Sequence, residues 1–466
     1  MFLSTRNYHY SYKFIVKSAK KNCEEKVKKK LDLLIFRLKR IPSFEYIIFF
    51  LYILLSGRFF LKNRAKITYA NIEIGRFVLA ETFCNYDCYL NKFKFYRTLF
   101  KNFLKAGALI NTCNSLNKKF KIRGVYVDHC GYLNGIIFSF FTLEKKIVYS
   151  NNYPLGIFCV DYKKNNKKDL TKYENALRIN IKKNINSIQK RKSEIKISKL
   201  TKEATFIPYM VKVNYKKLEN LDYKSFDYVI YCHSFTDGQL WHGYSGFENM
   251  RDWLEFTLDN LIKTNKKILI KPHPNFYNHS LNAEAIWDKK IYDIVLDRYK
   301  KYKNLTFIKT PIHNYLLLKK LNKNCILLSG FGTAILESAY MNFKSICTSH
   351  NFFNEKFKIS NMWKDKKDYL NLLNSSYLKL KRPSKIDLLK LAYCMFFYHT
   401  STYHKDFYDT IIRRNLKLSV KEYYKKFASP GRTLISKSRL KLLNDETKLS
   451  EKKIINEISK TIFEVK

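Results

Sequence analysis

The sequence predicts an α/β protein with two lobes, each formed by a wound parallel β-sheet, and with helical extensions at both ends of the chain. The length of 466 residues corresponds to roughly three domains, or two large ones. Hydrophobic residues make up 46% of the chain and aromatic residues 16%, which excludes disorder for most of it. Short apolar runs alternate with helical patterns in both halves, as they do in parallel sheets with crossover helices.

The first region, residues 1–62, combines a basic helical pattern with an uncharged segment. Apolar residues recur at helical spacing opposite a face of Lys and Arg, at Val27, Leu31, Leu34, Ile35 and Leu38. The uncharged segment 46–57 is shorter than the roughly 20 residues needed to cross a bilayer. It is either a buried helix or an interfacial element that docks on an anionic membrane together with the basic helix.

The second region, residues 63–215, is predicted to form the first lobe and a basic helical linker. Short apolar runs and helical stretches alternate over 66–74, 76–83, 95–116, 124–130, 134–146 and 146–150. Residues 161–200 are polar and basic with few aromatic side chains, which is typical of helical surface and linker.

The third region, residues 216–360, has a clear βα alternation and is predicted to form the second lobe. Strands are expected at 228–235, 267–271, 305–309, 325–330 and 344–349, with a helix between each pair. The last region, residues 361–466, is predicted to be helical. In doubly wound sheets ligands bind outside the carboxyl ends of the strands, so chemistry is expected just after each strand.

The formal net charge of +49 has two possible origins. Lys, Asn, Ile, Tyr and Phe are enriched together, which fits a drift in background composition. Alternatively, the chain is attracted to polyanions such as nucleic acid, anionic lipid, or acidic sugar nucleotides and polysaccharides. The charge alone does not choose among them.

The ten cysteines are scattered and lack the paired spacings of zinc sites, so no structural metal is expected. Several lie in apolar, strand-like runs, where a free thiol behaves as a small hydrophobe. The first twenty residues lack the continuous apolar core of a signal peptide. We therefore predict reduced cysteines and a cytoplasmic location.

The strand 267–271 leads into a histidine held between two prolines, in the run Lys271-Pro272-His273-Pro274. Such a histidine can donate a hydrogen bond or a positive charge to a departing phosphate, and Lys271 can add charge. The alternative is a proline turn that ends the strand and carries an incidental histidine.

The strand 325–330 leads into Ser329-Gly330-Phe331-Gly332-Thr333 at the start of a helix. Small residues there let backbone N–H groups approach a phosphate, and the hydroxyls can donate to its oxygens. The alternative is a plain helix cap. Glu337, one turn into the helix, is not at capping-box spacing and could accept both hydroxyls of a ribose.

Two aspartates are candidates for a general base that takes the proton of an acceptor hydroxyl. Asp237 follows the first strand of the second lobe, and Asp128 follows the strand 124–127 of the first lobe. For each, a turn residue bonded to its own backbone is an equal interpretation.

Several of these segments together resemble the carboxyl-terminal half of the bacterial capsule polysaccharide biosynthesis glycosyltransferases. This family includes the Kdo transferases and, more distantly, the polysialyltransferases and teichoic-acid glycerophosphotransferases. The segments are HSFTDGQ (233–239), Trp253, ILIKPHPN (268–275) and LLSGFGTAILESAYMNFKSI (327–346). The resemblance covers roughly residues 225–350 and only vaguely 120–160. It implies two Rossmann-like lobes of the kind called GT-B, a cytidine nucleotide donor and no metal.

Carried over to this sequence, the resemblance implies donor-phosphate contacts for His273 and Pro274, and assigns the family's Ser-Gly-Thr loop to Ser329, Gly332 and Thr333. It also implies that Glu337 binds the ribose. We add Lys271 and Gly330 to the predicted donor site, and His273, Asp128 and Asp237 are the predicted catalytic residues. The departures lie in the first lobe, which leaves the acceptor and the general base unassigned.

The sequence thus predicts a glycosyltransferase of surface polysaccharide biosynthesis that uses no cofactor. It would move a sugar, such as the acidic sugar Kdo, from a CMP-activated donor to a glycan or lipid-linked acceptor, in contact with an anionic membrane at the inner face of the plasma membrane. One alternative is a CDP-glycerol or CDP-ribitol phosphotransferase. Another is a basic nucleic-acid-binding protein, although no nucleic-acid motif is present.

Overall fold

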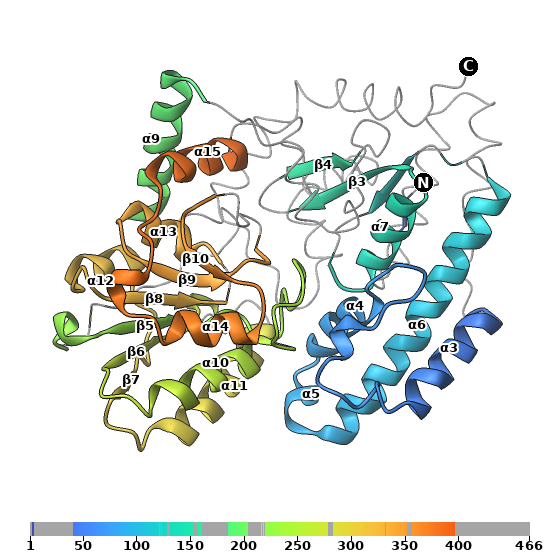
Figure 1. The fold of residues 1–466 in the computed structure, drawn as a ribbon, viewed down its shortest axis with the longest axis horizontal. Helices are drawn as coiled ribbons and strands as arrows, with labels where there is room; N and C mark the ends of the chain where they lie inside the picture. Colours follow the sequence, from blue (N-terminus) through green and yellow to red (C-terminus); the bar gives the residue numbers. More distant parts are fainter. Residues whose placement is uncertain are drawn as a thin grey trace, which may run out of the picture.

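A computed structural model describes two lobes that lie side by side (Figure 1). The described residues are 2–3, 41–120, 122, 124–127, 131–152, 156–160, 185–203, 216, 218, 220–277, 283–330, 332–351 and 357–396. The predicted basic helix over 27–38, the candidate Asp128 and the tail beyond 396 lie outside them.

The second lobe is built on a six-stranded sheet in which every neighbouring pair is parallel. Its order is β10-β9-β8-β5-β6-β7. The strands are β5 (Tyr228–Tyr231), β6 (Ile268–Lys271), β7 (Leu305–Phe307), β8 (Ile326–Ser329), β9 (Ser345–Thr348) and β10 (Asn361–Trp363). The chain starts in the middle at β5, runs to the β7 edge, and returns to β8 beside β5. This is a doubly wound α/β sheet, as predicted, and its topological switch point lies between β5 and β8.

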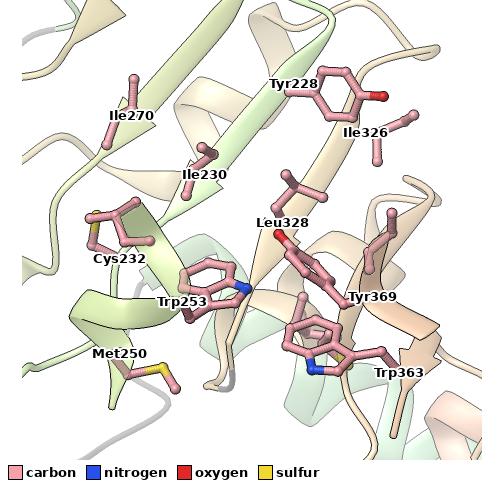
Figure 2. Close-up of a cluster of buried hydrophobic side chains, with 14 of the residues drawn as sticks. Tyr228, Ile230, Cys232, Met250, Trp253, Ile270, Ile326, Leu328, Trp363 and Tyr369 are labelled. Carbon is pink, nitrogen blue, oxygen red and sulfur yellow. The ribbon is translucent and has the colours of Figure 1, made fainter. Parts of the chain in front are cut away.

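Helices cover both faces of this sheet. They are α9 (Ser187–Glu203), α10 (Met250–Leu261), α11 (Ala283–Tyr299), α12 (Asn314–Lys320), α13 (Ala334–Tyr340), α14 (Lys366–Leu373) and α15 (Lys385–Phe396), with short 3₁₀ turns at Tyr223–Ser225, Pro274–Tyr277 and Tyr377–Lys379. Figure 2 shows the core on one face, where Trp253 of α10 lies over the strands. The rings of Trp253 and Trp363 are stacked with centroids 6.3 Å apart, and Trp363 contacts Tyr369 at 4.5 Å. Side chains of α10, β10 and α14 therefore share one core.

The second lobe extends beyond the range 216–360 that the sequence suggests. Strand β10 pairs with β9, and α15 packs against α9, where Lys385 lies 2.7 Å from Glu194 and Gln189 donates to the Tyr393 hydroxyl at 3.0 Å. Helix α9, expected in the linker of the first lobe, also packs against α13. Residues 187–203 and 361–396 thus belong to the packing of the second lobe.

The first lobe has a smaller, mixed sheet of four strands, in the order β1-β2-β3-β4. The strands are β1 (Phe2–Leu3), β2 (Gly124–Val127), β3 (Ile147–Asn152) and β4 (Gly156–Val160). The first three are parallel and β4 is antiparallel to β3, so this sheet is not the purely parallel one that the sequence predicts. Around it lie α3 (Phe44–Leu55), a 3₁₀ turn at Arg64–Lys66, α4 (Ile74–Phe83), α5 (Asp87–Leu90), α6 (Lys92–Lys119) and α7 (Asn134–Leu143).

The apolar run 76–83 forms α4 rather than a strand. Nearly every residue of α4 is buried, so its apolar residues are not confined to one face of the helix. A short continuous apolar run does not distinguish a buried helix from a buried strand.

The uncharged segment 46–57 is largely helix α3, which packs against α6. Tyr46, Phe50 and Ile53 form its buried face. The Tyr46 hydroxyl donates to the Phe103 carbonyl at 2.9 Å, and a Cβ at Gly107 would come within 2.3 Å of the Tyr46 ring, so glycine is required for this approach. The buried-helix interpretation is correct for this face. Within the described parts of the chain, no helix has the length and apolarity of a membrane span.

Candidate functional site

Three polar side chains lie in a row across the carboxyl ends of the central strands. Tyr231 of β5 is directly paired with Lys271 of β6 on one side and with Ser329 of β8 on the other. All three are buried, and the Lys271 ammonium lies 5.7 Å from the centre of the Tyr231 ring. Parallel strands that are otherwise apolar thus end in polar groups on both sides of the switch point, where ligands bind in such sheets.

Glu337 of α13 lies in the same buried region and accepts a hydrogen bond from the Asn314 side-chain amide at 2.6 Å. Burial raises the pKa of Glu337 to about 7, against the opposing effects of Asn314 and of the Lys271 charge. Burial likewise lowers the pKa of Lys271 to about 8, although Glu337 favours its charged form. The attraction between the two charges therefore offsets only part of the free-energy cost of burying them.

Two buried polar atoms near these charges lie close to each other, since a hydrogen bond with Asn314 partly offsets the raising of the Tyr231 pKa by burial. They are the Tyr231 hydroxyl and the side-chain oxygen of Asn314. A buried polar group without a partner costs about 1–3 kcal/mol, so native proteins keep few of them.

Histidines lie around the rim beyond this row. The rings of His273 and His233 have centroids 5.5 Å apart, and a Cβ at Gly332 would lie 3.5 Å from the His233 ring. Gly332 has a φ of +128°, which glycine adopts without strain. Burial lowers the pKa of His273 well below its ordinary value, and the neighbouring His233 and Lys271 lower it further. In the unliganded protein His273 is therefore neutral at pH 7, with one ring N–H to donate.

The other predicted donor-site residues shape the two loops. Pro274 begins the 3₁₀ turn after β6, and Gly330 is so close to Met250 that a Cβ would approach its sulfur to 2.3 Å. Thr333 precedes α13, and its side chain makes no capping hydrogen bond to the helix. Its hydroxyl is therefore not engaged as the plain helix cap that was the alternative interpretation.

The loop after β5 is fixed by a buried carboxylate that the sequence analysis did not single out. Asp288 of α11 accepts from the Ser234 hydroxyl at 2.6 Å and from the Phe235 N–H, the Thr236 N–H and the Thr236 hydroxyl, each at 2.9 Å. Burial raises its pKa to about 7, while these donors favour the ionised form. Four donors from one loop hold residues 234–236 in a single arrangement.

The same loop crosses to the first lobe. Asp237 accepts a hydrogen bond from the Tyr132 hydroxyl, and the Phe235 carbonyl accepts one from Tyr89. The Arg76 guanidinium donates to the carbonyls of Leu240 and Trp241, at 3.1 and 2.8 Å. Leu240 is buried within the hydrophobic core of the first lobe.

A buried ion pair connects the end of this loop to the first lobe. Arg64 lies 2.8 Å from Glu248, and burial raises the pKa of Glu248 to about 7 although Arg64 lowers it. We call residues 232–249 the bridging segment.

The structure thus brings most of the predicted donor-site residues to one end of one sheet. Asp237 lies at the contact between the lobes, with one carboxylate oxygen engaged by Tyr132, and Asp128 is not described. Of the residues that were missed, Asp288 left a signal in the sequence. It shares an apolar helical stripe with Ile291, Tyr292 and Val295, where a lone carboxylate indicates a buried partner. Asn314 and Tyr132 left none.

No metal centre is evident where the chain is described, because no group of three or more His, Cys, Asp or Glu side chains is arranged to hold an ion.

Fold and site together define a two-lobed α/β protein with polar and imidazole groups at the switch point of a doubly wound sheet. No family model matches the chain, and no curated protein sequence matches it significantly. Among solved structures it is similar to the beta Kdo 2,4 transferase KpsC of Thermosulfurimonas dismutans, with 12% identity and a TM-score of 0.35 over 59% of this chain and 79% of that one. It is also similar to the UDP-GlcNAc 2-epimerase of Methanocaldococcus jannaschii in complex with UDP-GlcNAc and UDP, with 14% identity and a TM-score of 0.28 over 62% and 79%. Similarity at this level assigns neither donor nor acceptor to the chain.

Proposed function

We propose that the protein is a glycosyltransferase that binds a nucleotide-activated sugar at the carboxyl ends of β5, β6 and β8. The observation that carries this proposal is the convergence of Lys271, His273, Ser329 and Glu337 at the switch point. These side chains supply donors for a phosphate and an acceptor for ribose hydroxyls within one site.

In the proposed reaction an acceptor hydroxyl attacks the anomeric carbon of the donor sugar, and the bond between that carbon and the phosphate oxygen breaks. The nucleotide leaves with the bonding electron pair. The N–H of His273 and the Ser329–Thr333 loop stabilise the negative charge that develops on the phosphate. Lys271 adds positive charge nearby. The acceptor proton passes to a carboxylate, for which Asp237 and Asp128 are the candidates.

We propose a CMP-linked acidic sugar as the donor, on the basis of the resemblance described above. CMP carries a single phosphate group, so fixed hydrogen-bond donors can stabilise its departure. The acceptor would be a growing surface glycan or glycolipid, reached at an anionic membrane. A CDP-glycerol or CDP-ribitol phosphotransferase would use the same His273 and Ser329–Thr333 contacts, and donor assays distinguish the two.

The proposal is tested by the change in melting temperature that nucleotides produce. A ligand that binds only the native state raises the melting temperature by mass action. CMP or CDP should raise it more than UMP, UDP, GDP or NAD, and a chelator should not abolish the effect. An equal response to all nucleotides, or loss of the response with chelator, would contradict the cytidine donor.

The nucleic-acid alternative predicts a different result. Binding to phosphate backbones weakens steeply with salt and does not discriminate among mononucleotides. Tight, salt-sensitive binding to nucleic acid without any cytidine response would favour that alternative.

A further inference from the structure

Helix α3 is apolar on the face that points away from the protein as well as on its buried face. Phe44, Ile48, Leu51 and Leu55 recur at helical spacing and are 73%, 52%, 50% and 88% exposed. Glu45 is the only charged residue of the helix. A helix that is apolar all round is normally enclosed, so the outer face of α3 calls for a second apolar environment.

Exposed apolar residues also lie on the elements next to α3. Phe100 of α6 is 40% exposed, and its ring lies 5.1 Å from that of Phe50 on α3. Phe60 and Leu61, just after α3, are also exposed, and the Phe60 ring contacts Tyr96 of α6 at 5.4 Å. Scattered exposed apolar residues are common, but four of them on one helix face, with others on the adjoining elements, mark an interaction site.

Exposed basic side chains lie on the same and adjoining elements. Arg58 lies over the ring of Tyr52, 5.6 Å from its centre, and Lys62, four residues further along the chain, is exposed. On α6, Lys101 and Lys105 are exposed at positions four residues apart, which places them on one side of that helix. Lys118 is close enough to contribute to the lowered pKa of Glu45, after the hydrogen bonds from its own backbone and Ser43.

We propose that the outer face of α3, with Phe60, Leu61 and Phe100, inserts into the interfacial region of an anionic lipid bilayer. Twelve helical residues span about 18 Å, against about 30 Å for the hydrocarbon core, so the helix lies along the interface. The exposed cations match acidic headgroups. A second copy of the chain is a poor occupant because each copy carries a net charge of +49. This membrane surface does not depend on the identity of the sugar donor.

The test uses the full chain and flotation with phosphatidylcholine vesicles that contain or lack phosphatidylglycerol. We expect binding only to the anionic vesicles, fading as salt screens the charges. The triple variant Phe44→Ser, Leu51→Ser, Leu55→Ser should bind at least about tenfold more weakly, since each side chain contributes apolar burial. Leu378→Ser is the matched control, because Leu378 is 87% exposed but lies in the second lobe. It should bind like the wild type.

A fluorescence measurement tests the same membrane contact without relying on the triple variant. Leu55→Trp should show a blue shift of the added tryptophan emission on anionic vesicles and quenching by brominated lipid chains. The melting temperature of each variant verifies that it is folded. The proposal is overturned if folded triple variant and control bind equally, which would place the contact elsewhere in the chain, for example in residues 1–40. It is also overturned if the wild type does not float at low salt.

Discussion

Charged side chains are buried in two regions of the molecule, and the two regions differ in how many hydrogen-bond partners these charges have. At the contact between the lobes, Arg64 lies 2.8 Å from Glu248 and also donates to the Phe59 carbonyl, and Asp288 accepts from four donors. At the rim of the second sheet, Glu337 accepts one hydrogen bond, from Asn314, and the Lys271 charge is the other group that favours its ionised form.

The difference indicates what each region is for. A buried charge with all its hydrogen bonds made fixes a structure, since removing one partner leaves the other desolvated. A buried charge with few partners has a shifted pKa, and groups with shifted pKa values cluster at functional sites. The lobe contact is therefore interpreted as architecture, and the rim as a binding site.

The largest expected effect comes from breaking the ion pair between Arg64 and Glu248 at the contact between the lobes. Arg64→Met leaves Glu248 buried without its partner and should lower the free energy of unfolding by about 3–5 kcal/mol. Denaturant titration measures this loss. The double variant Arg64→Met, Glu248→Leu should recover most of it, because no unpaired charge remains. An unchanged midpoint in the single variant would mean that the pair does not stabilise the lobe contact.

A smaller effect, on rate rather than stability, is expected at the rim. If the proposed function is correct, His273→Ala should reduce sugar transfer on the order of 100-fold, because it removes the proposed hydrogen-bond donor to the departing phosphate. The melting temperature should change little, since His273 lies in the loop beyond the end of a strand. Transfer assays with the folded variant provide the measurement. Full activity would make His273 part of an ordinary proline turn.

The smallest effect is expected for Glu337→Gln, which should raise the donor KM by about tenfold and leave kcat nearly unchanged, because a neutral amide accepts hydrogen bonds less strongly than a carboxylate. The pKa of about 7 makes this contact dependent on pH. In the wild type, donor KM should fall as pH rises through 7 and Glu337 ionises, whereas KM in the variant should not follow that titration. A loss of kcat with unchanged KM would instead indicate a catalytic role.

The raised pKa of Glu337 also affects the stability of the protein when no donor is bound. The folded protein holds the Glu337 proton more tightly than the unfolded chain, so ionisation between about pH 4.5 and 7 disfavours folding. The stability of the wild type relative to Glu337→Gln should therefore decrease over that window. Melting temperatures of both proteins across the range measure the difference.

The sequence was sufficient to predict five of the six strands of the second lobe, because parallel strands that are buried on both faces are short apolar runs between turn residues. Strand β10, at Asn361–Trp363, lies in the region predicted to be helical, and this prediction was wrong there. Since the carboxyl ends of parallel strands meet at one edge of the sheet, His273 and Ser329 could be placed together without knowing the strand order. The first lobe was less predictable, because the apolar residues of α4 are not confined to one face of the helix, and a short apolar run does not distinguish a helix from a strand.

Partners distant in sequence were beyond sequence reasoning. Nothing around Asn314 indicates that its amide reaches Glu337 on the next helix, and nothing around Tyr132 indicates the contact with Asp237, which is 105 residues away. Asp288 is the exception, because a carboxylate on an apolar helical stripe can be recognised from the spacing of its neighbours alone.

The bridging segment has a consequence for how the protein can be divided. If the chain were divided near residue 216, Leu240 would be exposed in the C-terminal fragment, and its place in the core of the N-terminal fragment would be empty. We therefore expect neither fragment to fold stably on its own. Gly238, Gly243 and Gly246 all have positive φ, of 69°, 144° and 98°, which glycine adopts without strain. A Cβ at Gly243 would also clash with His350, and a Cβ at Gly246 with Lys366. The bridging segment is therefore held from both sides, by the core around Leu240 and by Arg76 in the first lobe, and by His350 and Lys366 in the second.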